Sequence, residues 1–230
     1  MRSLSIIFGI VLLGLLLMFL VSPKPPAGGM KHGTPEDNTP AASTAQAAKP
    51  SAPSTPTEVL KPPMQGAFRV IMSVKDRGDV TIELYPAAAP ATVKQFTEWI
   101  TSGYYNGIKF HRVVPNFVVQ AGDPQTRSIS SKDLAAMTPD QISSAHLGAS
   151  GSGQNIPFEQ NKLQNITGTI AMALSSPRSN TASGQFYINL KSNHDLDGDY
   201  CVFGKVVSGM DVVQKIQQGD EITSMKVIGK

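Results

Sequence analysis

The chain has 230 residues, of which 40% are hydrophobic, so it is long enough to bury the core of one sizeable domain. Its formal net charge is only +3, and the part from Gly66 onward holds 15 of the 20 Lys and Arg residues and 14 of the 17 acidic ones. This near-neutral balance offers no basic surface for nucleic acid, and the single cysteine, Cys201, excludes an internal disulfide.

Residues 4–21 form an apolar stretch, LSIIFGIVLLGLLLMFLV, without a charged residue. As a helix, these 18 residues would span about 27 Å, which is close to the thickness of a bilayer core. A cleaved signal peptide has a shorter apolar part and small residues at its cleavage site, which residues 22–26 (SPKPP) do not supply. We interpret residues 1–21 as an uncleaved signal anchor; a cleaved signal peptide, which would release the protein, is the alternative.

Residues 22–65 have the composition of a linker. They contain ten of the 17 prolines, among Ala, Ser, Thr and Lys, and no aromatic residue. Such a segment cannot bury enough apolar surface to offset the entropy of ordering it, so the sequence predicts a disordered, extended linker. A linker of this kind would hold a domain away from a membrane surface, on the outer side of the plasma membrane if residues 1–21 are an anchor.

Residues 66–230 are predicted to form one globular, mainly β domain. Alternating apolar residues at 70–74 and 80–85, separated by Asp76 and Gly78, predict a β-hairpin. A helix is expected from Pro90, with Val93 and Phe96 on its apolar face and Gly103 at its end. Further strands are expected at residues 109–113, 117–120, 168–173, 185–190, 200–205 and 222–228.

A second helix is expected between Ser208 and Gly219, with Ser208 and Asp211 forming a capping box. Many antiparallel strands with two helices far apart in the sequence favour a closed, eight-stranded antiparallel β-barrel capped by two α-helices.

Three segments have residue patterns more specific than ordinary strands require. They are FHRVVPNFVVQAGDP at residues 110–124, GTIAMALSSPRSNTASGQFYINL at 168–190 and DLDGDYCVFGKVVSGMDVV at 195–213. In these motifs and in their order, the chain resembles the cyclophilin family of peptidyl-prolyl cis/trans isomerases over essentially all of residues 68–230.

The resemblance implies roles for individual residues. The catalytic arginine of the family matches Arg112, the floor of its proline pocket matches Phe117, and its carbonyl-contacting glutamine matches Gln120. Further substrate-binding positions match residues on the following strands and loops: Val118, Ala173, Tyr187 and Leu196 as apolar pocket residues, Leu174 through its backbone, Gln185 and Phe186 beside the pocket, and Tyr200 at its rim.

The residue types suit this reaction. Rotation about an Xaa-Pro bond is slow because it breaks amide resonance, and the twisted amide leaves a lone pair on the prolyl nitrogen. A guanidinium beside that nitrogen stabilises the twisted state more than either planar state, which is the condition for catalysis. Because no proton is transferred, we expect His111 to be structural or to lie at the pocket rim.

The resemblance therefore predicts an isomerase that assists the folding of exported proteins, with proline-containing polypeptides as partners. A non-catalytic, proline-peptide-binding chaperone module of the cell envelope is the alternative. We expect no metal and no cofactor, since Asp195, Asp197 and Asp199 do not fit the spacing of a calcium loop. Asn165-Ile166-Thr167 also matches a glycosylation sequon.

The chain departs from the family pattern at four places. Ala121 stands where the family often has the first of two glycines, a mild change that should leave the strand intact. Val118 stands where methionine is commoner, and Asp195 replaces an aromatic residue that packs on the inhibitor cyclosporin, so weak cyclosporin binding is expected. Residues 125–153 are longer than in a minimal family member, and Thr138, Pro139 and Gln141 predict a short helix there. This segment either influences substrate or partner choice or is a tolerated insertion.

Overall fold

The computed structural model describes residues 68–229. The predicted anchor at 1–21 and the predicted linker at 22–65 lie outside the described residues. Within the described range, no helix has both the length and the apolar composition needed to cross a bilayer.

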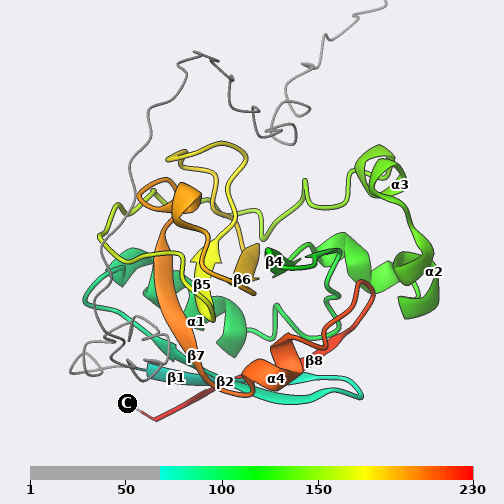
Figure 1. The fold of residues 1–230 in the computed structure, drawn as a ribbon, viewed down its shortest axis with the longest axis horizontal. Helices are drawn as coiled ribbons and strands as arrows, with labels where there is room; N and C mark the ends of the chain where they lie inside the picture. Colours follow the sequence, from blue (N-terminus) through cyan, green and yellow to red (C-terminus); the bar gives the residue numbers. More distant parts are fainter. Residues whose placement is uncertain (1–67, 230) are drawn as a thin grey trace, which may run out of the picture. The chain divides into compact units, whose positions relative to one another are not determined.

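Eight strands form one antiparallel sheet in the order β3-β4-β6-β5-β7-β2-β1-β8 (Figure 1). Each predicted strand overlaps an observed one, which confirms the mainly β class. The strands are β1 (Phe68–Val74), β2 (Gly78–Leu84), β3 (Arg112–Val114), β4 (Val118–Ala121), β5 (Thr169–Met172), β6 (Phe186–Asn189), β7 (Val202–Ser208) and β8 (Ile222–Ile228).

The sheet is strongly curled, but its strands do not close it into a complete barrel. The edge strands β3 and β8 are not paired with each other. The gap is instead bridged by backbone hydrogen bonds from the irregular segment before β3 to the start of β8 and the loop before it: Gly107 N donates to Ile222 O at 2.8 Å, and Phe110 N donates to Asp220 O at 2.9 Å. The expected closed barrel is thus slightly overstated, because the chain before β3 meets the chain before β8 through loops.

Helix α1 (Pro90–Thr101) packs against the interior of the curled sheet and completes the main core. Its Phe96 ring lies 4.8 Å from that of Phe203 and 5.8 Å from that of Phe186, centroid to centroid. The helix has no cap from its own sequence; the carboxylate of Glu159 accepts hydrogen bonds from Ala91 N and Thr92 N instead. The predicted first helix is confirmed, but its cap comes from a distant loop.

The second predicted helix is much shorter than expected. Strand β7 continues through Ser208, and Gly209 then takes a left-handed conformation with φ of 85°, so that α4 (Met210–Val213) is a single turn. Ser208 pairs with Thr81 in the sheet and therefore does not form the predicted capping box.

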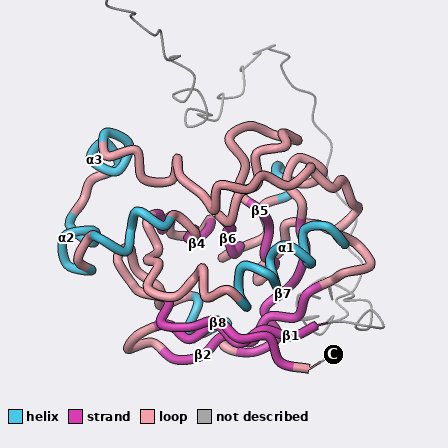
Figure 2. The backbone as a smooth tube through the Cα atoms, turned by 180° about the vertical axis from the view of Figure 1, so that it is seen from behind, coloured by secondary structure: helices cyan, strands magenta, loops and turns pink. Residues whose placement is uncertain are grey.

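The long segment at residues 125–153 contains two short helices, α2 (Ser131–Ala136) and α3 (Pro139–Ser144). Helix α3 begins with the predicted capping box between Thr138 and Gln141. Figures 1 and 2 show α2 and α3 at the periphery of the domain, away from the central strands. The described residues also include short 3₁₀ helices at Pro124–Ser128 and His194–Leu196.

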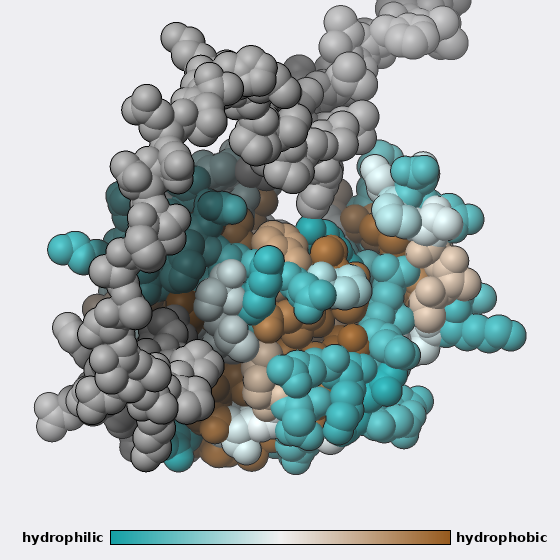
Figure 3. Space-filling model, viewed as in Figure 1, coloured by the Kyte–Doolittle hydropathy of each residue, from teal (hydrophilic) through white to brown (hydrophobic). Residues whose placement is uncertain are grey.

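The sheet separates two apolar clusters because neighbouring residues on a strand point to opposite faces. Val119, Ile170 and Ile188 belong to the interior core. Val118, Ala171, Tyr187 and Val202 form a second, smaller cluster on the other face, which we call the outer cluster. Figure 3 shows apolar surface in the middle of the face drawn in Figure 1, bordered by hydrophilic side chains.

Candidate active site

Sheet register places Arg112 in a row of side chains that crosses four strands. Arg112 on β3 pairs with Gln120 on β4, Gln120 pairs with Tyr187 on β6, and Tyr187 pairs with Ala171 on β5. Paired residues in an antiparallel sheet share a face, so the row lies on the face of the outer cluster. The sheet thereby brings a cation, an amide and an aromatic ring side by side.

Hydrogen bonds fix the polar half of this row. Arg112 Nη1 donates to Gln120 Oε1 at 3.2 Å, and Gln120 Nε2 donates to Gln185 Oε1 at 3.1 Å. The guanidinium carbon of Arg112 also lies 5.6 Å from the centroid of the Phe117 ring, within the range of a cation–π contact. The arginine head is therefore held between an amide and an aromatic ring.

Partial burial of Arg112 strengthens the electrostatic interactions that its positive charge can make. Desolvation lowers the pKa of Arg112, and the neighbouring Tyr200 acts in the opposite direction. An arginine stays protonated despite such a shift, so the site keeps a partly desolvated cation. Electrostatic stabilisation by such a group exceeds that of the same group in water.

The apolar half of the site is the outer cluster and the residues around it. Tyr187 and Tyr200 meet edge to face, with centroids 6.0 Å apart and an interplanar angle of 78°. Burial raises the pKa of both phenols, so both are neutral at ordinary pH. Partly buried side chains border the buried ones: Phe117, Leu163, Ala173, Leu196 and Tyr200. A small apolar ring can pack on such a surface.

A buried network of three asparagines is hydrogen-bonded to residues of this cluster and its border. Asn165 Oδ1 accepts a hydrogen bond from the Tyr187 hydroxyl at 2.8 Å and from Asn189 Nδ2 at 3.2 Å. Asn193 Nδ2 donates to Asn189 Oδ1 at 2.7 Å and to the backbone oxygen of Phe117 at 3.1 Å. The network thus connects two aromatic residues of the cluster and its border, Tyr187 and Phe117.

Most of the expected site residues lie together in the structure. Arg112, Gln120 and Gln185 are linked by hydrogen bonds, and Phe117 contacts the arginine. The expected apolar and rim positions all belong to or border the outer cluster: Val118, Ala173, Tyr187, Leu196 and Tyr200. Among the residues not expected from the sequence are Leu163, Ala171 and Val202 of the cluster and the three asparagines below it.

Three expected residues turn away from this cluster. Phe186 is fully buried in the interior core and packs on Phe96, because it lies between Gln185 and Tyr187 on a strand whose residues alternate. Leu174 packs its side chain against the same interior core. His111 is 2% exposed, so its side chain is buried and not at the pocket rim.

His111 has an unusual environment. Neither ring nitrogen has a hydrogen-bond partner among the described residues. Burial lowers the pKa of His111 to about 4, an effect that Asp123 opposes and Arg112 reinforces. The ring is therefore neutral at ordinary pH.

Two of the three aspartates near Leu196 have structural partners. Asp197 accepts from the backbone nitrogen of Asn165 at 2.6 Å and contacts Nδ1 of His194, while Asp199 pairs with Arg178 at 2.7 Å. Asp195 lies exposed on the 3₁₀ helix beside Leu196. The carboxylates of Asp197 and Asp199 stabilise the loop that carries Leu196.

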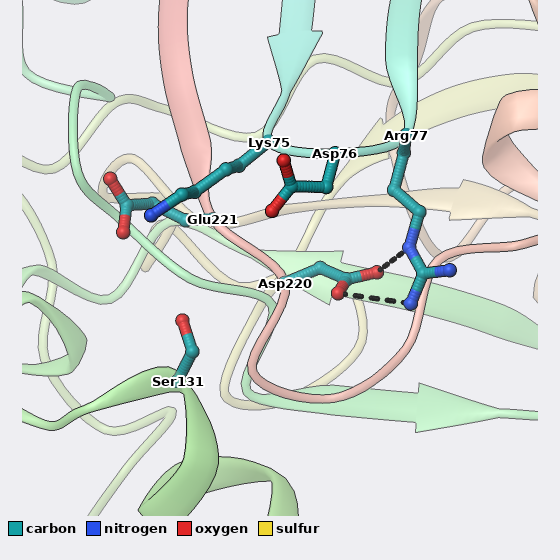
Figure 4. A pocket seen from close by; sticks show the side chains of 6 residues that line it. All are labelled: Lys75, Asp76, Arg77, Ser131, Asp220 and Glu221. Carbon is teal, nitrogen blue, oxygen red and sulfur yellow. Dashed lines mark hydrogen bonds and ion pairs between the residues drawn. The ribbon is translucent and has the colours of Figure 1, made fainter.

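A separate crevice of about 320 Å³ lies near the β1–β2 turn. Figure 4 shows its wall, where Arg77 and Asp220 form a two-pronged ion pair with distances of 2.8 and 3.3 Å. Its other lining residues are Lys75, Asp76, Ser131 and Glu221. None of the six belongs to the Arg112 row, and its polar, charged lining does not suit an apolar ring.

Comparison with protein families agrees with this geometry. The family model described as cyclophilin type peptidyl-prolyl cis-trans isomerase matches residues 69–228. The chain therefore belongs to the cyclophilin family, and its enzyme class is that of the peptidyl-prolyl cis-trans isomerases.

Curated relatives carry the same description. The chain is 40% identical over 153 residues to a probable peptidyl-prolyl cis-trans isomerase of Brucella suis, covering 66% of this chain and 72% of that protein. It is 39% identical over 144 residues to a peptidyl-prolyl cis-trans isomerase of Acinetobacter baylyi, covering 60% of this chain and 66% of that protein.

Solved structures support the fold. A cyclophilin-type isomerase of Cryptosporidium parvum superposes with a TM-score of 0.56 at 23% identity, covering 71% of this chain and 99% of that one. A second structure of that protein was determined in the presence of the dipeptide Ala-Pro. At this identity the likeness concerns the fold alone.

Proposed function

We propose that this protein accelerates rotation about Xaa-Pro bonds in flexible polypeptides, with Arg112 stabilising the twisted amide while the outer cluster holds the proline ring. The observation that carries the proposal is the position of the guanidinium, beside the Phe117 ring and bonded to Gln120, at the edge of an apolar cluster. The reaction needs both features: the cation interacts with the prolyl nitrogen, and the apolar surface holds the proline ring.

The chemistry requires no proton transfer and no covalent step. The barrier to rotation is about 20 kcal/mol, because the planar amide must lose its resonance. A donor that meets the prolyl nitrogen only when the amide is twisted stabilises that state selectively. Gln120 fits the task of contacting a substrate carbonyl, and the neutral phenols of Tyr187 and Tyr200 add no charge that competes with Arg112.

The chemical class of the ligand follows from the same surface. The site combines a short row of polar donors with a small apolar cluster, which suits a proline ring and the peptide groups on either side of it. The Ala-Pro dipeptide used with the Cryptosporidium protein has this chemistry. We therefore take short proline peptides as the probe substrates.

The decisive experiment compares the full-length chain with its Arg112→Ala variant in an isomerisation assay on a model Xaa-Pro peptide. Loss of the guanidinium should lower kcat/KM about 10²–10³-fold, as loss of one transition-state donor does elsewhere. Arg69→Ala is the matched control, because Arg69 is an exposed arginine on β1 that pairs with the buried carboxylate of Glu83 and lies outside the Arg112 row. A folded wild-type protein that binds proline peptides without accelerating exchange would favour the non-catalytic chaperone instead.

We extend the proposal to the place of action. The charge-free stretch at residues 4–21 and the proline-rich residues 22–65 favour a membrane-tethered enzyme that assists the folding of exported proteins outside the cytoplasm, in the periplasm if the cell has an outer membrane. The full chain should stay with the membrane after an alkaline wash and be degraded by protease added from outside the plasma membrane. Resistance to that protease in cells from which any outer membrane and cell wall have been removed, with the plasma membrane intact, would contradict this location.

A further inference from the structure

The two glutamines beside Arg112 belong to a chain of hydrogen bonds that has a direction. Arg112 donates to Gln120 Oε1, and Gln120 Nε2 donates to Gln185 Oε1. Gln185 Nε2 then donates to the backbone oxygen of Ser150 at 2.6 Å. All three hydrogen bonds therefore point the same way, from Arg112 towards Ser150.

The first donor and the last acceptor in this series of hydrogen bonds, the Arg112 guanidinium and the Ser150 carbonyl, determine its direction. A guanidinium can only donate and a backbone carbonyl can only accept, whereas a glutamine amide can do either from its two ends. Turning both amides around would set the NH₂ group of Gln120 against the guanidinium and the oxygen of Gln185 against the Ser150 carbonyl. The Ser150 carbonyl thus fixes which end of Gln185 faces Gln120, in the orientation that agrees with the one the guanidinium imposes on Gln120.

Ser150 is in turn held by Asp123, which follows β4 and is 0% exposed. Asp123 Oδ2 accepts from Gly148 N at 2.6 Å and from Ser150 N at 3.4 Å, and Oδ1 accepts from Gln125 N at 2.8 Å. A carboxylate suits three donors because both of its oxygens are acceptors, and such charge-assisted bonds are strong. Asp123, which lies just after β4, therefore bonds to residues near both ends of the long segment at residues 125–153 and holds those ends together.

We propose that Asp123 is a positioning residue for Arg112, acting through the loop at residues 148–150, Gln185 and Gln120. The proposal rests on the proposed function, since it assigns Asp123 a role in the rate of isomerisation without contact with the substrate. This proposal gives residues 148–150 of the long segment a role in the active site. It assigns no such role to the exposed helix α3 of the same segment.

The first test is Asp123→Asn in the full-length chain, assayed on a model Xaa-Pro peptide. An asparagine has one acceptor oxygen, so whichever way its amide is turned, its NH₂ group faces a backbone N–H, either that of Gln125 or those of Gly148 and Ser150. The loop should then shift and release Gln185, and kcat should fall about tenfold while KM changes little, because the outer cluster is untouched. Asp140→Asn is the control, because it makes the same chemical change on exposed helix α3 and should leave the rate unchanged.

A double-mutant cycle separates positioning from a general loss of structure. In a Gln185→Ala background the link to Arg112 is already cut, so adding Asp123→Asn should change kcat by less than about twofold. Losses that multiply would show that Asp123 acts by another route and would overturn the proposal alone. A wild-type protein without isomerase activity would overturn both this proposal and the proposed function.

If Asp123→Asn does not fold, Gly148→Ala displaces the same loop more gently. Gly148 has φ of 87°, and a Cβ there would lie 3.1 Å from His111 Nε2; Gly153 has φ of 82°, with nothing within 4 Å of such an atom. Gly153→Ala therefore carries the same backbone strain without displacing the loop. Only Gly148→Ala should lower kcat, and only when Gln185 is present; equal losses in both variants would refute the proposal.

Discussion

The hydroxyl of Tyr187 donates a hydrogen bond to Oδ1 of Asn165 across 2.8 Å, although 22 residues separate them in the chain. Asn165 comes from a loop, and its side chain is fully buried beneath the candidate proline pocket. The same oxygen also accepts from Asn189. A single side chain therefore supports the aromatic wall of the pocket.

Asn165→Leu should destabilise the domain and impair substrate binding. The substitution leaves the buried hydroxyl of Tyr187 without its partner, at a cost of about 1–3 kcal/mol in the free energy of unfolding. Tyr187 should then lose its fixed orientation, so KM should rise more than kcat falls. Urea unfolding and peptide kinetics measure the two effects. Asn106→Leu, at an exposed position, should change stability by no more than about 0.5 kcal/mol; a similar loss there would contradict the argument.

Phe117 and Phe186 should respond in opposite ways to the same substitution. Phe186 is fully buried in the interior core, whereas Phe117 is partly exposed beside Arg112. Phe186→Leu should lower the free energy of unfolding by about 1–2 kcal/mol and leave the kinetics of the folded fraction unchanged. Phe117→Leu should change stability less and raise KM. A kinetic defect confined to Phe186→Leu would mean that the core phenylalanine contributes to the site after all.

Local patterns in the sequence predicted most of the fold. Alternation of apolar residues located the β1–β2 hairpin, the other six expected strands each overlap an observed one, and the Thr138–Gln141 capping box located α3, because these features depend on neighbours within a few residues. The second helix was predicted too long and its capping box was wrong, because pairing of Ser208 with Thr81, a long-range contact, extends β7 into the start of the expected helix. Closure of the sheet likewise depends on loops distant in sequence, at residues 107–110 and 219–222.

The resemblance located the site better than it located individual side chains. His111 directly precedes Arg112, and Phe186 directly precedes Tyr187. Because neighbouring residues of a strand point to opposite faces, this alternation would have placed both side chains on the face away from the site. The sequence contains no comparable signal for Asn165. The sequence shows it only as part of a sequon, a pattern common by chance, whereas the structure buries it and places its Nδ2 3.4 Å from Asp197 Oδ1, to which it donates. Only the three-dimensional contacts reveal its role.

Asp195→Trp should increase the affinity for cyclosporin. Asp195 is exposed on the 3₁₀ helix next to Leu196, at the rim of the outer cluster, where a carboxylate offers no apolar surface to a macrocycle. An aromatic side chain there should improve the dissociation constant about tenfold or more by burying additional apolar area. Calorimetric titration checks this, with Asp211→Trp, an exposed aspartate on α4, as control. Tight binding by the wild-type protein would contradict the prediction.

The buried ring of His111 should make the domain less stable in mild acid. Burial lowers the pKa of His111 to about 4, against 6.5 for an unperturbed histidine, so between these values the unfolded chain binds a proton that the folded protein does not. This contribution to stability is fully present above pH 6.5 and is lost as the pH falls towards 4. A difference of this size corresponds to at most about 3 kcal/mol.

Urea unfolding of the full-length chain between pH 7 and pH 4.5 measures this effect. His111→Phe keeps a flat ring without a titratable group, so the fall in stability over this range should become distinctly smaller. His146→Asn is the control: His146 is exposed and has φ of 54°, a backbone conformation that asparagine tolerates. Its pH dependence should match that of the wild type. An unchanged slope in His111→Phe would show that other groups, and not the buried imidazole, cause the loss of stability in acid.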